Sequence, residues 1–321
     1  TNFNDATWGG IDGNKQFVVV GDNGVIMTSW EGVDWETVVP TSSSGIDLVN
    51  FDFREVIWVG SEENKRFLAV GSRGAIVAGQ YNETLNQYEW DWKRAEVNAE
   101  IEEIELKEID LEGATYGGPT DEERIILVSN TNHTLVYKQD TGWQNRKFGN
   151  IDWHSVAWAN ILPEGVPENK RRRCFFLAGE NNIRRLKVDE KTKKLTTVGS
   201  GYSTPGLEQS FQDILVGNES CYFAGQNLDN EEPLFYTYRY NGDEWEWVSL
   251  STIPVEEETM RQFAGVSAND ERLFVVGNNN QDEPQILKLT TERSWEPVDL
   301  ESMDIGEIEF REIISVSEFT D

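Results

Sequence analysis

Side chains able to perform acid–base or metal chemistry are sparse and widely separated in this sequence. The chain of 321 residues contains two histidines, His133 and His154, and two cysteines, Cys174 and Cys221. It has no Cys-x-x-Cys or His-x-x-x-His pair, so the ligand spacing of common zinc sites is missing. A Ser-His-Asp triad would need one of these two histidines, and no nucleophile-elbow motif is present. The sequence therefore predicts no catalytic residue, no metal ligand and no cofactor.

Acidic and amide side chains gather in two predicted loops of the C-terminal half. Residues 226–233 (QNLDNEEP) and 278–284 (NNNQDEP) share asparagine, an acidic pair and a closing proline. Oxygen-rich loops bind Ca²⁺ in many proteins, but the spacing of an EF-hand is absent. Ordinary turns have the same composition, so we interpret these residues as loop-face binding candidates and not as metal ligands. The candidates are Asp229, Asn230, Glu231, Asp282 and Glu283.

Seven basic residues cluster in the fourth of several repeats, within a strongly acidic chain. The sequence has 58 acidic and 28 basic residues, which gives a formal net charge of −30. This charge disfavours binding to nucleic acids and to anionic membranes. The cluster is a candidate docking site for an acidic partner; alternatively, it neutralises the nearby Glu164, Glu168 and Glu180. Its members are Lys170, Arg171, Arg172, Arg173, Arg184, Arg185 and Lys187.

The elements that must position these residues repeat along the whole chain. Each repeat opens on a strand of the FREVIWVG type and continues with a stronger apolar strand that ends in a small residue, such as Gly21 or Gly71. A turn rich in Asn, Asp and Gly, a third strand and a Trp-led fourth strand complete the repeat. The opening strands recur at intervals of roughly fifty residues, which is the mark of a repeat architecture. They begin at Phe3, Phe53, Leu111, Trp153, Phe211, Phe263 and Phe310.

Short apolar runs rich in β-branched and aromatic residues predict strands rather than helices. Four antiparallel strands in each radially repeated unit are typical of a β-propeller blade. The predicted fold class is therefore all-β, with a single β-propeller domain over residues 1–321. Six complete four-stranded blades plus one extra inner strand at 310–316 leave a six-bladed and a seven-bladed ring open. The predicted repeats are 3–50, 51–105, 106–150, 151–205, 206–257 and 258–304, with a partial repeat at 305–321.

The turn before the fourth strand of the first repeat resembles an Asp-box, also called a BNR repeat. The pattern Ser-x-Asp-x-Gly-x-x-Trp is approximated with glutamate in place of aspartate and the glycine one position early, at Ser29, Glu31, Gly32 and Trp35. The other repeats keep at most the tryptophan. Similar repeats occur in sialidases, sortilin-type receptors, a photosystem II assembly factor and tail or fibre proteins of bacteriophages. The resemblance implies a β-propeller whose Asp-box is a structural turn on the outer rim.

A sialidase is the most specific enzymatic hypothesis that this resemblance implies. Sialidases use an arginine triad, a Tyr-Glu nucleophile pair and an Asp acid/base, carried by inner strands and their loops. The predicted inner strands here carry only Arg54 and Arg311, in matching positions next to Glu55 and Glu312. We interpret these arginines as members of ion pairs within their repeats, so the sequence predicts that the protein is not an enzyme.

The predicted function is that of a non-enzymatic structural or protein-interaction β-propeller. A component of a larger assembly, such as a virion tail or fibre, is the first hypothesis. An assembly chaperone that resembles the photosystem II factor and a glycan-binding or sialidase-like propeller are the alternatives. The expected partners are other proteins of the assembly, further copies of this chain among them, and neither nucleic acid nor membrane.

Cys174 and Cys221 occupy equivalent strands of adjacent repeats. Sheets packed face to face lie about 10 Å apart, whereas a disulfide needs Cα atoms about 5.5–6 Å apart. We therefore expect two buried free thiols. No signal peptide is recognised and no apolar run reaches about 18 residues, so a virion or cytoplasmic location is favoured.

Overall fold

Successive strands of each repeat pair with one another, and they form six four-stranded antiparallel sheets among the residues that the computed structural model describes. Within every sheet the strands follow chain order from one edge to the other. The chain divides into two compact units, Thr1–Val156 and Ala157–Asp321. The described residues are 2–11, 13–38, 50–59, 65–82, 87–91, 106–119, 122–198, 208–217, 219–229, 233–250, 260–269, 272–279, 284–289 and 295–297.

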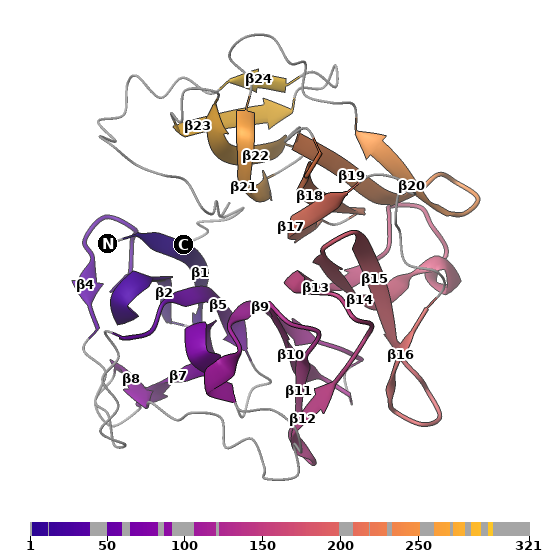
Figure 1. Cartoon of the computed structure of the whole chain (residues 1–321). Coiled ribbons are helices and arrows are strands. Elements are labelled where there is room, and N and C mark those ends of the chain that lie inside the picture. The colour runs from indigo at the N-terminus through magenta and orange to yellow at the C-terminus, as the bar shows by residue number, and fades with distance from the viewer. Residues whose placement is uncertain are drawn as a thin grey trace. The chain divides into compact units, whose positions relative to one another are not determined.

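Three sheets belong to the first unit (Figure 1). The first sheet contains β1 (Phe3–Ile11), β2 (Asn14–Gly21), β3 (Ile26–Ser29) and β4 (Glu36–Thr37). The second sheet contains β5 (Phe53–Val59), β6 (Arg66–Gly71), β7 (Ala75–Asn82) and β8 (Gln87–Asp91). The third sheet contains β9 (Leu111–Gly117), β10 (Arg124–Ser129), β11 (Thr134–Lys138) and β12 (Gly142–Arg146). Short 3₁₀ turns are η1 (Asp22–Gly24), η3 (Ser72–Gly74) and η4 (Leu106–Glu108).

The remaining sheets belong to the second unit, whose boundary falls inside the strand β13. The fourth sheet contains β13 (Trp153–Ile161), β14 (Arg172–Gly179), β15 (Asn182–Val188) and β16 (Leu195–Thr197), and the 3₁₀ turn η5 (Glu168–Lys170) precedes β14. The fifth sheet contains β17 (Gln209–Val216), β18 (Ser220–Asn227), β19 (Pro233–Tyr240) and β20 (Trp245–Leu250). The sixth sheet contains β21 (Met260–Asn269), β22 (Arg272–Asn279), β23 (Pro284–Leu289) and β24 (Trp295–Pro297).

These strands lie within the six complete repeats predicted from the sequence, so the predicted all-β class with four antiparallel strands per repeat is confirmed. The extra inner strand predicted at 310–316 lies outside the described residues. That the whole chain forms one domain stays a prediction.

A constant register links the first two strands of the repeats. Trp8 pairs with Phe17, and Trp58 pairs with Phe67 at the equivalent place. The ring centroids of these two pairs are 4.4 and 4.7 Å apart, and Trp158 and Phe175 of the fourth sheet are 4.6 Å apart. Tilted aromatic pairs at such distances stabilise a sheet beyond the area that they bury. The equal sequence separation of Trp8 from Phe17 and of Trp58 from Phe67 therefore reflects one recurring aromatic contact.

The small residue at the end of the second strand is required by a close approach of two backbones. A Cβ atom on Gly21 would lie 2.1 Å from the carbonyl oxygen of Asn2, and one on Gly71 would lie 2.1 Å from that of Asp52. Both sites adjoin a β-bulge in the opening strand, where the register shifts after Phe3 and after Phe53. A bulge bends its strand and brings the extra backbone close to the neighbouring strand. The fifth sheet has the same bulge after its opening phenylalanine, Phe211.

Turns after the second strand connect each sheet to the next one along the chain within the first unit. Asn23, at φ 59°, donates its backbone N–H to the carboxylate of Asp52 over 3.0 Å. Arg73, at φ 54°, donates its backbone N–H to Asp110 over 2.9 Å. The acceptors lie immediately before the opening strands of the following sheets. These backbone-to-carboxylate bonds fix one repeat against the next, because charged acceptors make strong hydrogen bonds.

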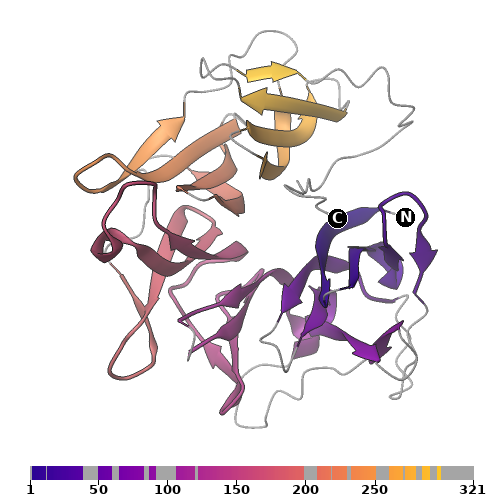
Figure 2. The same cartoon turned by 180° about the vertical axis from the view of Figure 1, so that it is seen from behind.

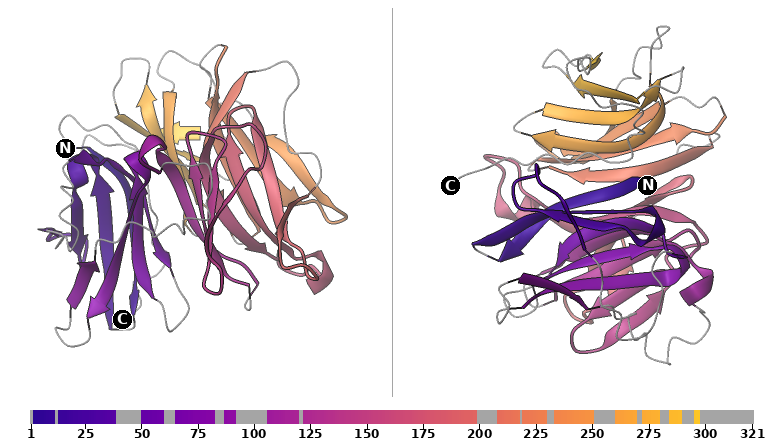
Figure 3. Two further views of the ribbon diagram at one scale, coloured as in Figure 1. Left: turned by 60° about the horizontal axis from the view of Figure 1, so that its bottom comes forward. Right: turned by 90° about the vertical axis from the view of Figure 1, so that its left-hand side faces the viewer.

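The second strand is apolar over most of its length because both of its faces are buried. In β6, Phe67 and Ala69 pack in a cluster shared with the first sheet, while Leu68 and Val70 pack in a cluster shared with the third sheet. Alternate side chains of a strand point to opposite faces, so a strand between two sheets reads as a continuous apolar run. The first two sheets lie face to face (Figure 3).

The second unit contains an aromatic core between its fourth and fifth sheets, which are adjacent in the views from both sides (Figure 2). Cys174 and Phe176 of β14 pack there against Phe223 of β18 and Tyr238 of β19. The rings of Phe176 and Phe223 are 5.2 Å apart in an edge arrangement. This core positions the basic residues described below.

Candidate functional site

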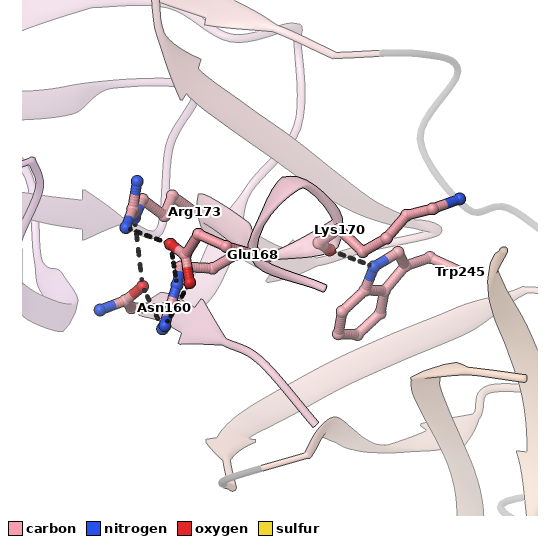
Figure 4. Close-up of polar contacts among 6 residues, drawn as sticks. Asn160, Glu168, Lys170, Arg173 and Trp245 are labelled. Carbon is pink, nitrogen blue, oxygen red and sulfur yellow. Dashed lines mark hydrogen bonds and ion pairs between the residues drawn. The ribbon is translucent and has the colours of Figure 1, made fainter. Parts of the chain in front are cut away.

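Two of the predicted basic residues share a single carboxylate on the surface of the fourth sheet (Figure 4). Arg171 donates through Nε and Nη2 to the two carboxylate oxygens of Glu168, over 2.7 and 2.9 Å. Arg173 donates through Nη2 to Oε1 of the same group over 3.0 Å. Hydrogen bonds from Arg171 lower the pKa of Glu168. Both arginines also contact Oδ1 of Asn160, a residue of β13.

Arg172 lies on the opposite face of the chain from Arg171 and Arg173, and it faces the fifth sheet. Its guanidinium carbon lies 5.6 Å from the ring centroid of Trp245, within the range of a cation–π contact. The indole Nε1 of Trp245 donates to the backbone carbonyl of Lys170 over 2.9 Å (Figure 4). Lys170 itself donates through Nζ to the backbone carbonyl of Asp243 over 3.1 Å. The segment 170–172 therefore covers the tryptophan that opens β20.

Arg185 of β15 contacts Tyr238, which belongs to the same aromatic group as Trp245. It donates through Nη1 to the hydroxyl of Tyr238 over 2.5 Å, and its guanidinium carbon lies 5.1 Å from that ring. Tyr238 is 2% exposed and stacks on Trp245, with centroids 5.3 Å apart and planes at 20°. Burial raises the pKa of Tyr238, and the charge of Arg185 opposes this rise. Arg172, Trp245, Tyr238 and Arg185 together form what we call the cation–aromatic stack.

The seven basic residues thus do not form one uniform surface. Arg171 and Arg173 pair with Glu168, whereas Lys170, Arg172 and Arg185 contact the fifth sheet. Arg184 is half-buried, on the other face of β15 from Arg185, and Lys187 is exposed. Of the three neighbouring glutamates, Glu168 pairs with arginines, while the backbone N–H of Glu164 bonds Glu219 and Glu180 forms a β-bridge with Ser210.

The aromatic partners of the basic residues were not identified from the sequence. One sequence signal could have predicted the separation of the arginines. Side chains alternate along a strand, which places Arg172 on the opposite face from Arg171 and Arg173. The contact with Tyr238 joins residues of different sheets, and no local pattern encodes it.

The loop-face candidates fall mostly outside the described part of the chain. Asp229 is exposed, and its backbone N–H bonds Oδ1 of Asn227 over 2.9 Å in a tight turn after β18. Asn230, Glu231, Asp282 and Glu283 lie among the residues that the structure does not describe. Within the described ranges, no group of three His, Cys, Asp or Glu side chains is arranged to hold a metal ion.

The residues considered for catalysis are dispersed over separate elements. His133 precedes β11, where its Nδ1 lies 3.3 Å from Oδ1 of Asn145, and His154 is on β13. Arg54 on β5 acts electrostatically on Glu112 of β9, whose pKa is raised by burial and lowered in part by that arginine. Arg311 lies outside the described residues. Arg54 thus interacts with a carboxylate of the next repeat, in addition to any partner within its own repeat.

Cys174 and Cys221 are buried and free, as predicted from their spacing in adjacent sheets. Burial raises the pKa of the Cys174 thiol to about 12 and that of Cys221 well above its usual value. Such thiols stay protonated at neutral pH and are poor nucleophiles.

The turn of the first sheet that resembles an Asp-box has a closed local structure. The backbone N–H of Gly32 donates to Oγ of Ser29 over 2.9 Å, and Gly32 adopts φ +77°. The indole Nε1 of Trp35 donates to the carbonyl of Gly32 over 3.2 Å, and its ring packs 6.4 Å from that of Phe17. The serine, the glycine and the tryptophan of the motif therefore hold one another in place.

Comparison with solved structures identifies the fold. The chain is similar to the WD40 β-propeller domain of Doa1, with a TM-score of 0.57 and 11% sequence identity over 94% of this chain and 83% of that one. The fold is a β-propeller. Raptor from Chaetomium thermophilum is also similar, with a TM-score of 0.54 and 8% identity over 92% of this chain and 25% of that one.

The likeness to these propellers concerns the fold alone, because the sequence identities are low. No protein-family model and no curated protein matches the sequence. Among the described residues, no helix is both long and apolar enough to cross a membrane.

Proposed function

We propose that this β-propeller is a non-enzymatic protein-interaction module of a larger assembly. The contact surface is the exposed part of the basic cluster, namely Arg173 and Lys187. The observation that supports this proposal is the sharing of Glu168 by two arginines, because one carboxylate balances only one of the two positive charges. A local excess of positive charge on a chain of net charge −30 is suited to an acidic partner.

The remaining basic residues have a different part in the proposal. Lys170, Arg172 and Arg185 contact the fifth sheet and hold the basic strands in place. Arg173 is 54% exposed, so its guanidinium is accessible to a partner while still bonded to Glu168. Exposed charges of this kind contribute modestly to affinity and more to the rate and orientation of association.

The assembly that we favour is a virion tail or fibre, or another particle built from repeated copies of its subunits. The closed turn formed by Ser29, Gly32 and Trp35 supports the resemblance to Asp-box propellers, in which such turns are structural. The dispersed His133, His154 and Arg54 support the proposal that the chain carries out no catalysis. Hydrolysis of a fluorogenic sialoside by the purified protein would contradict that part.

The acidic-partner surface is tested with a fluorescein-labelled octaglutamate peptide at low ionic strength. We expect Arg173→Glu to weaken binding about fivefold, since an exposed charge pair contributes up to about 1 kcal/mol and reversal replaces attraction by repulsion. Lys147→Glu is the matched control, because Lys147 is exposed in the first unit and the change in net charge is the same. Equal weakening by both variants would show attraction by overall charge only, and would refute the proposed surface.

The homo-oligomer alternative is tested by sedimentation of the wild-type protein and of Arg173→Glu. Self-association that Arg173→Glu removes would identify another copy of the chain as the acidic partner. A monomer that also fails to bind the acidic peptide would contradict the proposal.

A further inference from the structure

A second surface with opposite charge lies on the first sheet. Residues 30–37, which connect β3 to β4 and include β4, are all exposed, and we call them the edge segment. Trp30 is 51% exposed, Val33 76% and Trp35 37%. Glu31, Asp34 and Glu36 are interspersed with these apolar side chains. Large apolar side chains that gather at a surface mark sites of interaction more often than scattered ones do.

The edge segment is held in a defined conformation although it is exposed. Ser29 and Trp35 both bond the backbone of Gly32. A Cβ atom on Gly32 would also lie 3.4 Å from the ring of Phe17, so the turn packs directly on the sheet. A rigid segment loses little conformational entropy on binding. The backbone that carries Trp30, Glu31 and Asp34 is therefore anchored on both sides of Gly32.

The fifth sheet contains a comparable segment, and basic residues of the chain cover it. Trp245 follows the turn between β19 and β20, the third and fourth strands of the fifth sheet, just as Trp35 follows the turn between β3 and β4 in the first sheet. The turn before Trp245 contains Asp243 and Glu244. A basic stretch covers it: Arg172 contributes its guanidinium and Lys170 its backbone carbonyl. Among the described residues, the chain thus contains an acidic tryptophan turn with a basic cover and a second one for which no such cover is described.

We infer that the edge segment binds an arginine- and lysine-bearing segment of a partner protein. A guanidinium group is suited to the face of Trp30, since its planar cation stacks on aromatic rings. The carboxylates of Glu31 and Asp34 follow Trp30 in the sequence and attract the same cation.

Lys170 and Arg172 of this chain already contact the fifth sheet. Charge complementarity and the aromatic face favour a basic segment of another protein, and a further copy of this chain, whose Arg173 and Lys187 are exposed, is the competing occupant. The edge segment shares no residue with the surface proposed for an acidic partner. The two proposals can therefore be refuted independently.

The probe for this test is a labelled peptide, Gly-Lys-Arg-Arg-Arg-Gly, blocked at both ends and titrated with the intact protein while its fluorescence anisotropy is measured. We expect Trp30→Ala to weaken binding about threefold to fivefold, which corresponds to one exposed cation–π contact. This substitution leaves the net charge at −30, so attraction by overall charge is unchanged. Trp30→Phe keeps an aromatic face and should retain most of the affinity.

The carboxylates are tested with a pair of matched double variants. Glu31→Gln with Asp34→Asn should weaken binding by about tenfold, because two charge-assisted contacts are lost. Glu190→Gln with Glu208→Gln removes the same charge from exposed positions of the second unit and should have little effect. Equal effects of the two double variants, or unchanged affinity of Trp30→Ala, would overturn the proposal.

A second copy of the chain is the competing occupant. Self-association of the wild-type protein that Trp30→Ala abolishes, measured by sedimentation without peptide, would overturn the inference of a separate partner. Binding of an uncharged peptide, in which glutamine replaces the basic residues, with equal affinity would overturn the inferred chemistry. A circular-dichroism spectrum checks that Trp30→Ala stays folded, and Trp30→Phe provides the second variant if it does not.

Discussion

The first and fifth sheets both have a tryptophan where the turn into the fourth strand ends, and the two differ in what lies over it. Trp245 stacks on Tyr238 and is covered by Arg172 and by the backbone of Lys170. Trp35 contacts Phe17 of its own sheet and remains 37% exposed. The same repeat position is therefore covered in one sheet and partly exposed in the other, as far as the described residues show. What decides between these roles is the neighbouring segment, and not the tryptophan itself.

The largest effect is expected when the ring that supports Trp245 is removed. Tyr238→Ala should lower the free energy of unfolding by about 3–5 kcal/mol, the usual cost of truncating a buried aromatic side chain. Tyr238→Phe, the control, loses only the hydroxyl that accepts from Arg185 and should cost about 1.5–3 kcal/mol. Urea unfolding followed by tryptophan fluorescence measures both. Equal costs would show that the hydroxyl, and not the ring, supports the stack.

The difference between the two sheets is tested by replacing one tryptophan in each of them with alanine. Trp245→Ala should cost about 2–3 kcal/mol, below the range for a fully buried ring because this residue is only half-buried. Trp30→Ala should change stability by less than about 0.5 kcal/mol, as surface substitutions do. Thermal melts of the two variants under one set of conditions measure the difference. Similar melting temperatures of the two variants would show that the cover over Trp245 does not stabilise the fifth sheet.

Trp35→Ala should have an intermediate effect on stability. The variant loses an aromatic contact with Phe17 and the hydrogen bond to the carbonyl of Gly32, together worth about 1–2 kcal/mol. Trp35→Phe should recover the aromatic part only. Chemical denaturation gives the two values, and a cost as large as that of Trp245→Ala would mean that Trp35 belongs to the core.

Within the cation–aromatic stack, the smallest effect is expected for the cation over Trp245. Arg172→Met keeps much of the apolar stem and should cost about 0.5–1 kcal/mol, the range of an exposed cation–π contact. A double-mutant cycle with Trp245→Ala isolates the pairwise energy. A coupling energy near zero would show that Arg172 packs beside the ring without attracting it.

Much of the fold could be predicted from the sequence because its signals are local. The offset between Trp8 and Gly21 recurs as that between Trp58 and Gly71, and it corresponds to a shared register and a shared bulge. Apolar runs such as that at Phe67–Gly71 indicate strands buried on both faces. Turn residues between them set the strand boundaries.

The arrangement of the basic residues could not be predicted in the same way. Their clustering in sequence suggested a single surface, whereas Arg171 and Arg172 point to opposite faces of the chain. Which groups meet those faces depends on β19 and β20 of the next sheet, and so on packing between repeats. The exposure of Trp30 was equally hidden, since its neighbours in space and not in sequence determine how much of it is covered.

The hydrogen bonds that tie one repeat to the next have an evolutionary consequence. Their donors are backbone N–H groups, and the donating position is occupied by Asn23 in one turn and by Arg73 in the next. A substitution that tolerates the positive φ of the donating position can therefore keep the bond, whereas loss of the accepting aspartate removes it. Repeats joined in this way can differ in the donor's side chain and still keep the same backbone contact. The same turns offer positions where a chemical label or a new recognition residue could be introduced without loosening the propeller.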